Sequence, residues 1–167
     1  MFRGMAPELC ECVVGRYRGC GDCSALTAYN VGVEEDPRVG IPPELVAWQM
    51  RLFEQTCVEA CDAFEHRLQN PKGESADAIL AMFARLLATM LERFLLIHPY
   101  ANGNGHCSRL LIWVVMVRYG FPPKSWPLNR SPAYGEAIRA HRDGHATALA
   151  LFLLRAIAEK VNLPFSS

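Results

Sequence analysis

HPYANGNGHCSR, residues 98 to 109, separates two apolar helical patterns, and the rest of the fold can be built outward from it. Pro99 disfavours helix in the residue before it, and Gly103 and Gly105 weaken any helix that crosses the segment, so the preceding helix is expected to end near His98. The next helix is expected to begin near Gly105. Since a helix N-terminus presents unpaired N–H groups and partial positive charge, the turn predicts a cradle for an anion such as phosphate.

The two ends of this segment add chemistry to the predicted cradle. Arg109 follows Gly105 by about one helical turn, so its guanidinium can reach back toward an anion at the N-terminus. His98 is the natural proton acceptor near neutral pH. A base, a cation and an anion cradle together indicate transfer of a phosphorus-centred group to a hydroxyl. The alternative from the residues alone is a simple turn between helices, with His98 as a cap.

Apolar residues spaced three and four apart predict helices on both sides of the turn. The predicted helices cover residues 42–69, 75–97, 105–119, 131–144 and 145–161. Pro42 and Pro43 open the first of them, and Ser75 is the expected N-cap of the second. The centre of the third, LLIWVV, is apolar on nearly every side, so we expect it to be buried all round.

The N-terminal stretch, to about Gly40, is less regular. Residues 26–33 carry β-branched and aromatic side chains and are predicted to form a strand, while Asp36 and Pro37 predict a turn. The expected fold is therefore mostly α, with a small β-hairpin near the N-terminus. A chain of 167 residues of which 51% are hydrophobic suits one core, so a single domain over residues 1–167 is expected.

Charge and hydropathy exclude some classes of partner. The chain carries 17 basic and 17 acidic residues, and this balance does not favour a nucleic acid partner. The strongest apolar run is too short to cross a bilayer, so no membrane contact is expected. The N-terminus lacks the layout of a secretory signal, which makes a cytoplasmic protein the expectation.

The cysteines allow two interpretations. There are seven of them, an odd number in a chain with no mark of secretion, so reduced structural thiols are expected rather than a disulfide framework. The alternative is a four-thiolate zinc site in the cluster of Cys10, Cys12, Cys20 and Cys23.

The segment also resembles the signature of the Fic family, HPFx(D/E)GNGRxxR. The matching positions are His98, Pro99, Gly103, Asn104, Gly105 and Arg109, with Tyr100 in place of the aromatic Phe. GRYRG at residues 15–19 is similar to the GxYR segment that precedes the family's flap, and the double proline and the closing pair of helices are also similar. The resemblance implies a Fic-type helical bundle with a hairpin flap at about residues 26–41.

The resemblance also implies an activity, the transfer of AMP from ATP to a Ser, Thr or Tyr hydroxyl of a target protein. His98 would deprotonate that hydroxyl as general base. The ATP phosphates would be held by Gly103, Asn104, Gly105, His106 and Arg109. The target segment would dock on the flap by strand addition, and Mg²⁺ would bridge phosphate oxygens.

Two positions depart from the family's pattern. Asn102 stands where the family has its acidic metal ligand, so Mg²⁺ should bind more weakly or be held mainly by the nucleotide. His106 replaces the family's first arginine, which should lower phosphate affinity, unless it is simply an exposed residue of the first helical turn. The alternative function is a degenerate Fic domain that binds nucleotide or a protein partner without efficient transfer. Removal of a nucleotide from a modified protein would use the same residues.

Regulation and the outlying residues complete the expectations. The family's inhibitory pattern (S/T)xxxE(G/N) has no match here, so restraint would come from a separate small inhibitory protein or be unnecessary.

Tyr134 and Arg142 are weak candidates for a nucleobase pocket, and Tyr134 is expected rather in the core. Arg16 and Arg18 alternate with Tyr17. We expect their side chains to be exposed to solvent on a strand rather than to bind nucleic acid.

Overall fold

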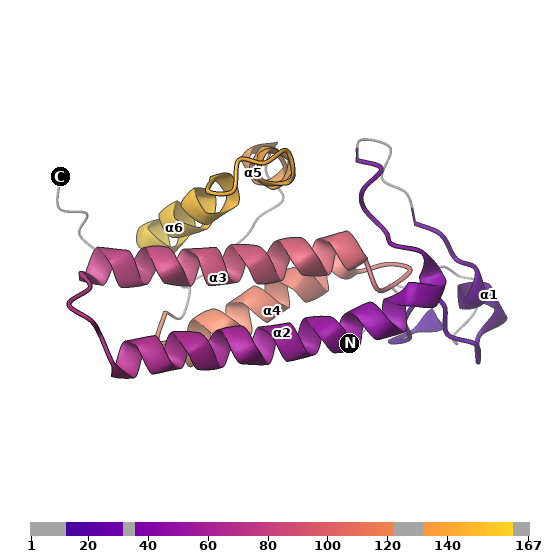
Figure 1. Cartoon of the computed structure of the whole chain (residues 1–167). Helices are drawn as coiled ribbons and strands as arrows, with labels where there is room; N and C mark the ends of the chain where they lie inside the picture. Colours follow the sequence, from indigo (N-terminus) through magenta and orange to yellow (C-terminus); the bar gives the residue numbers. More distant parts are fainter. Residues whose placement is uncertain (1–12, 32–35, 122–131, 162–167) are drawn as a thin grey trace. The chain divides into compact units, whose positions relative to one another are not determined.

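A computed structural model describes residues 13–31, 36–121 and 132–161, the last four of these by their backbone alone. The described part of the chain is mostly helical (Figure 1). Its helices are α1 (Ser24–Thr27), α2 (Pro43–Gln69), α3 (Ala76–Ile97), α4 (Asn104–Arg118), α5 (Pro132–Arg142) and α6 (Ala148–Val161). The helices predicted from apolar spacing are thus confirmed, with small shifts at their ends.

Local signals in the sequence set the helix ends. The N–H of Ala78 donates to Ser75 Oγ over 3.2 Å, which confirms Ser75 as the cap of α3. Gly120 follows α4 with φ +81°, and the next residue, Phe121, donates its N–H back to the Met116 carbonyl over 2.9 Å. This left-handed glycine closes the helix, because glycine adopts that φ without strain.

The predicted strand at residues 26–33 is not observed where the structure describes it, at residues 26–31. Leu26 and Thr27 belong to α1 instead, and their N–H groups both donate to the Cys23 carbonyl. The Thr27 hydroxyl bonds to the same carbonyl, and Leu26 is fully buried. Burial of Leu26 and this local back-bonding outweigh the strand propensity of the stretch. No strand forms among the described residues, and residues 32–35 of the predicted flap lie outside them.

Contacts divide the chain into two compact units. The first contains Met1–Cys57 and Arg93–Ser108, and the second contains Val58–Glu92 and Arg109–Ser167. Helices α2, α3 and α4 each contribute residues to both units.

In the first unit, the start of α2 packs against the end of α3. The rings of Phe53 and Phe94 meet edge to face with centroids 5.9 Å apart, and Arg93 donates to Gln49 Oε1 over 2.8 Å. Val46 and Ile97 are almost fully buried in the same unit. The turn after α3 leads directly into α4, as Figure 1 shows.

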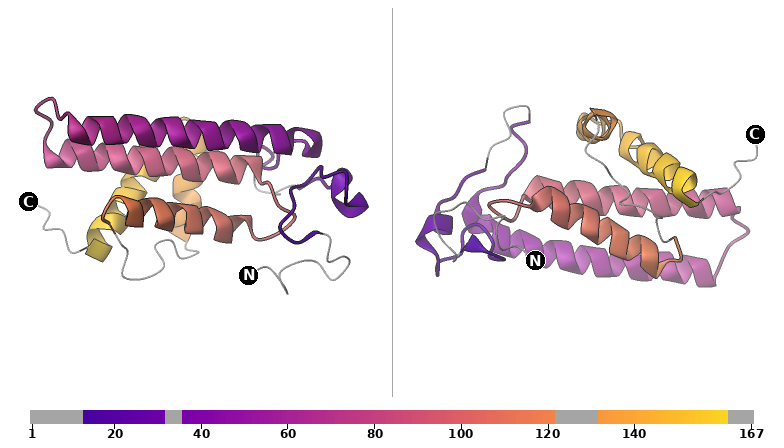
Figure 2. Two further views of the ribbon diagram at one scale, coloured as in Figure 1. Left: turned by 90° about the horizontal axis from the view of Figure 1, so that it is seen from below. Right: turned by 180° about the vertical axis from the view of Figure 1, so that it is seen from behind.

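In the second unit, an aromatic cluster joins α2 and α3, which lie side by side (Figure 2). The Phe83 ring stacks on Phe64 and Phe121, with centroids 5.4 and 5.1 Å away, and meets the edge of Tyr119. Elsewhere in this unit α5 packs on α6, and the rings of Tyr134 and Phe152 lie 5.8 Å apart. Tyr134 is 7% exposed, as the expectation of a core residue requires.

The expectation that α4 is buried on every side is wrong. Ile112, Val115 and Met116 are buried, whereas Val114 and Val117 are 52% and 44% exposed. An apolar sequence on all sides does not fix which side meets other helices, because that depends on how many neighbours pack against the helix. Among the described helices, none combines the length and the unbroken hydrophobicity needed to cross a bilayer.

Candidate phosphate-handling site

The candidate site begins where α3 stops. The His98 N–H still donates to the Phe94 carbonyl over 3.0 Å, but His98 itself has φ +51°, the left-handed region that side chains other than glycine seldom occupy. Pro99 explains the change of direction, because it disfavours helical backbone in the residue before it. The site therefore starts with a histidine held in a costly conformation, which requires support from its surroundings.

The His98 ring is half-buried and oriented by main chain. Its Nδ1 lies 3.4 Å from the Leu95 carbonyl oxygen. With a proton on Nδ1 the ring donates to that oxygen, and Nε2 is then the basic nitrogen. A carbonyl oxygen can only accept, so this contact favours the tautomer with the proton on Nδ1.

Asn104 holds the turn between the two helices. Its Nδ2 donates to the Tyr100 carbonyl over 2.8 Å, while its Oδ1 accepts the Tyr100 N–H over 2.9 Å. The side chain is 2% exposed. Sequence reasoning assigned this amide to a phosphate, whereas here both of its ends serve the backbone of Tyr100.

The first turn of α4 is where the sequence predicts an anion cradle. His106 and Cys107 both donate their N–H groups to the Gly103 carbonyl, each over 3.0 Å. The N–H groups of Asn104 and Gly105, which precede them, have no acceptor inside the helix. Gly103 has φ +83°, which lets the chain turn sharply into the helix.

Asn102 lies two residues before the start of α4. It is exposed, and its Oδ1 accepts the Gly103 N–H over 2.7 Å. The predicted metal ligand is therefore a neutral oxygen that already accepts a hydrogen bond. His106 is exposed on the first turn of α4. Arg109 follows on the same helix and is the first residue there that belongs to the second unit.

Arg18 supports this site, and sequence reasoning assigned it wrongly to a solvated strand. The residue is 0% exposed. Its Nε donates to the His98 carbonyl over 2.8 Å, and its Nη2 donates to the Ile97 carbonyl over 3.0 Å. Its backbone N–H donates to the Pro99 carbonyl, also over 2.8 Å. These bonds hold the carbonyls of the last residue of α3 and of the two residues after it, a role that no short motif around Arg18 reveals. Arg16, two residues earlier, is exposed.

Two tyrosines pack beside the turn. The rings of Tyr17 and Tyr100 have centroids 5.4 Å apart. Burial raises the pKa of Tyr100 to about 12, with a further contribution from the neighbouring Tyr17. Burial also raises the pKa of the Cys107 thiol. Tyr100 and Cys107 therefore stay neutral near pH 7.

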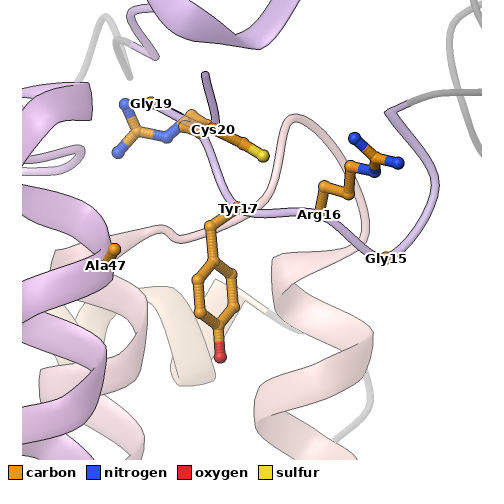
Figure 3. Close-up of a pocket in the computed structure, with 7 residues that line it drawn as sticks. Gly15, Arg16, Tyr17, Gly19, Cys20 and Ala47 are labelled. Carbon is orange, nitrogen blue, oxygen red and sulfur yellow. The ribbon is translucent and has the colours of Figure 1, made fainter. Parts of the chain in front are cut away.

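A cavity of about 300 Å³ lies at the N-terminal turn that contains Tyr17 and Arg18 (Figure 3). It is lined by residues 15–20 and by Ala47 of α2. The Tyr17 ring points away from the side chain of Arg16, which leaves the same turn in the opposite direction (Figure 3). None of the lining residues comes from the segment 98–109, although two of them, Tyr17 and Arg18, contact that segment.

The zinc alternative receives no support from the described residues. Within them, no group of three or more His, Cys, Asp or Glu side chains is arranged to hold a metal ion. Cys20 is a free thiol, whereas Cys23 is disulfide-bonded, so the expectation of a reduced thiol is wrong for Cys23. Cys10 and Cys12 lie outside the described residues.

Arg142 has a structural partner. Its Nε lies 3.3 Å from Glu92 Oε1, and the two side chains are 7% and 17% exposed. A nearly buried ion pair fixes this guanidinium, which weakens the interpretation of Arg142 as a contact for a nucleobase.

Comparison with known proteins finds partial similarities of one kind. A protein adenylyltransferase fic-1 of Caenorhabditis briggsae is 40% identical over 42 residues, which is 25% of this chain and 8% of that protein. A protein adenylyltransferase Fic of Drosophila mojavensis is 29% identical over 90 residues, 54% of this chain and 17% of that protein. That of Drosophila melanogaster is 32% identical over 57 residues, 34% of this chain and 12% of that protein. No family model matches the chain.

These similarities suggest a Fic-like domain. The chain spans less than a fifth of the length of the curated relatives it matches. The mostly helical fold is consistent with a helical bundle.

Proposed function

We propose that the chain is a Fic-like nucleotidyltransferase that moves AMP from ATP to a Ser, Thr or Tyr hydroxyl of a target protein. The observation that carries the proposal is the combination at one turn of an oriented histidine and the N-terminus of α4. The names of the partial relatives, protein adenylyltransferases, support the same chemistry.

In this proposal His98 Nε2 takes the proton of the target hydroxyl. The hydroxyl oxygen then forms a bond to the α-phosphorus of ATP, and the bond from that phosphorus to the bridging oxygen breaks, so that pyrophosphate leaves. The N–H groups of Asn104 and Gly105 would stabilise the charge on the phosphate oxygens, helped by the partial positive charge of the helix end. Arg109 would hold the terminal phosphates, and the target segment would dock on residues of the predicted flap.

A protein-held Mg²⁺ does not fit the residues present. Mg²⁺ prefers anionic oxygen ligands, and Asn102 offers a neutral oxygen that accepts the Gly103 N–H. We therefore assign no step to a metal ion held by the protein. An ion that takes part would be carried by the nucleotide phosphates, and its effect should depend weakly on residue 102.

The test is transfer of a label from α-labelled ATP, followed by mass spectrometry of the modified protein. The purified chain, incubated with ATP and a cell lysate, should label a target protein or itself. His98→Ala should abolish labelling, because it removes the proposed general base. His145→Ala, which removes an exposed histidine of the second unit, is the matched control and should label normally. Equal labelling by wild type and His98→Ala would contradict the proposal.

A second function, nucleotide binding without transfer, is favoured by one observation. The hydrogen bond from Gly103 N–H to Asn102 Oδ1 uses a donor of the cradle, so an anion has to compete for it. The double variant Asn102→Asp and His106→Arg separates the two functions. If this variant binds nucleotide and transfers nothing, the result favours the function of nucleotide binding without transfer. A gain of AMP transfer would instead show that the scaffold is catalytically competent.

A further inference from the structure

The Arg18 guanidinium joins the end of α3 to two other stretches of the first unit. Besides the His98 and Ile97 carbonyls, it donates from Nη1 to the Tyr29 carbonyl over 3.1 Å and from Nη2 to the Ile41 carbonyl over 3.0 Å. All four acceptors are main-chain oxygens. The guanidinium therefore fixes backbone positions that are far apart in the sequence and depends on no single side chain.

The stretch around Gly40 is tied to the same place by its own backbone. The Gly40 N–H donates to the Leu96 carbonyl over 2.9 Å. A Cβ added at Gly40 would lie 2.4 Å from the Val31 carbonyl oxygen, so residues 29–31 and 40–41 approach each other closely. We call these two segments the flanking stretches, because they lie on either side of residues 32–39 in the sequence. Only glycine allows this approach, since Gly40 also has φ +86°.

The planar fork explains why arginine occupies this position. Burial lowers the pKa of Arg18, so the protein bears a cost for the charge, and the four carbonyl oxygens offset it. A lysine ammonium has three N–H donors on a single nitrogen, so it cannot donate a separate N–H to each of the four oxygens. Position 19, next to Arg18, has to be glycine, because a Cβ there would lie 1.9 Å from the Pro43 carbonyl oxygen.

We propose that Arg18 is a positioning residue that holds the His98 backbone and the flanking stretches 29–31 and 40–41 in one fixed frame. The catalytic consequence rests on the proposed function, in which the flanking stretches are the ends of the flap that docks the target. Arg18 then sets the distance between the docked hydroxyl and the general base. It touches neither ATP nor the target, and it acts through main-chain carbonyls.

The test compares Arg18→Lys with Arg16→Lys in the full chain. Arg16 is exposed in the same turn, so its variant controls for the change of side chain. Arg18→Lys should lower the single-turnover rate of transfer about 100-fold, since a displacement of about 1 Å has that effect. Its affinity for ATP should stay within about twofold, because the cradle on α4 is untouched. A purely structural role would instead reduce the fraction of protein that binds ATP and leave the rate per bound ATP unchanged.

Two further readouts need no activity. Arg18→Lys should shift the NMR signal of the His98 ring and reduce the hydrogen-exchange protection of the Gly40 amide, and Arg16→Lys should change neither. If the wild-type chain transfers nothing, the proposed function fails, and these readouts still decide whether Arg18 holds the frame. A folded Arg18→Lys protein with wild-type protection at Gly40 and an unshifted His98 signal overturns the inference.

A measurement on the wild-type chain covers the case in which Arg18→Lys does not fold. If Arg18 holds the His98 backbone and the stretch around Gly40 in one frame, both regions should open together. The backbone amides of Arg18 and Gly40 should then show similar protection from hydrogen exchange. Protection of Gly40 about tenfold or more below that of Arg18 would show that the flanking stretch opens independently, which overturns the inference.

Discussion

Asn104→Ala is predicted to destabilise the turn that carries the candidate site by about 3 kcal/mol. The change removes the two hydrogen bonds between the Asn104 amide and the backbone of Tyr100, at 2.8 and 2.9 Å. Each such bond contributes about 1 kcal/mol net, and leaving the Tyr100 N–H and C=O poorly solvated costs roughly another 1 kcal/mol between them. Asn104 is 2% exposed, so water replaces these bonds poorly.

The assay is urea unfolding followed by circular dichroism, with Asn102→Ala as the matched control. Asn102 is the same residue type two positions earlier, but it is exposed and its side chain accepts the Gly103 N–H. Its variant should lose only about 0.5–1 kcal/mol. A loss below about 1 kcal/mol for Asn104→Ala, or equal losses for the two variants, would refute the reasoning that the buried amide holds the turn.

Two other predictions concern the core and the alkaline range. Phe83→Ala should cost about 3–5 kcal/mol in urea unfolding, because the ring is fully buried among aromatic neighbours; Phe121→Ala, at the half-buried edge of that cluster, should cost less. The pKa of Tyr100 is raised from 10.0 to about 12, so the fold favours its neutral form and loses stability as pH rises from 10 toward 12. The wild-type chain should therefore lose more stability than Tyr100→Phe between about pH 9 and pH 11, and equal losses would contradict the assignment.

Much of the candidate site follows from local sequence. Pro99 disfavours helix at His98, so α3 ends at Ile97, and glycine at 103 permits the sharp turn into the next helix. The side-chain partners do not follow, because Asn104 could serve a phosphate or the backbone with the same chemistry. Its choice of Tyr100 depends on how the turn folds back on itself.

The helices were predictable for the same reason, and the irregular N-terminal stretch was not. Apolar spacing repeats over many residues in α2 and α3, so local errors cancel. Residues 26–31 are few, and their strand propensity is outweighed by one buried side chain, Leu26, and by the Thr27 hydroxyl. The exposed side chains of α4, such as Val114, also show that local sequence does not decide which apolar residues are buried.

By itself, the sequence determined where helices begin and end around residues 98–109, and it determined that a histidine and a helix N-terminus share one turn. These features depend on residues within a few positions of one another. Only the tertiary structure decided that Arg18 is buried and donates to the His98 carbonyl, 80 residues away. Such a contact depends on how three separate stretches pack, and a local pattern of charges cannot distinguish a buried guanidinium from an exposed one.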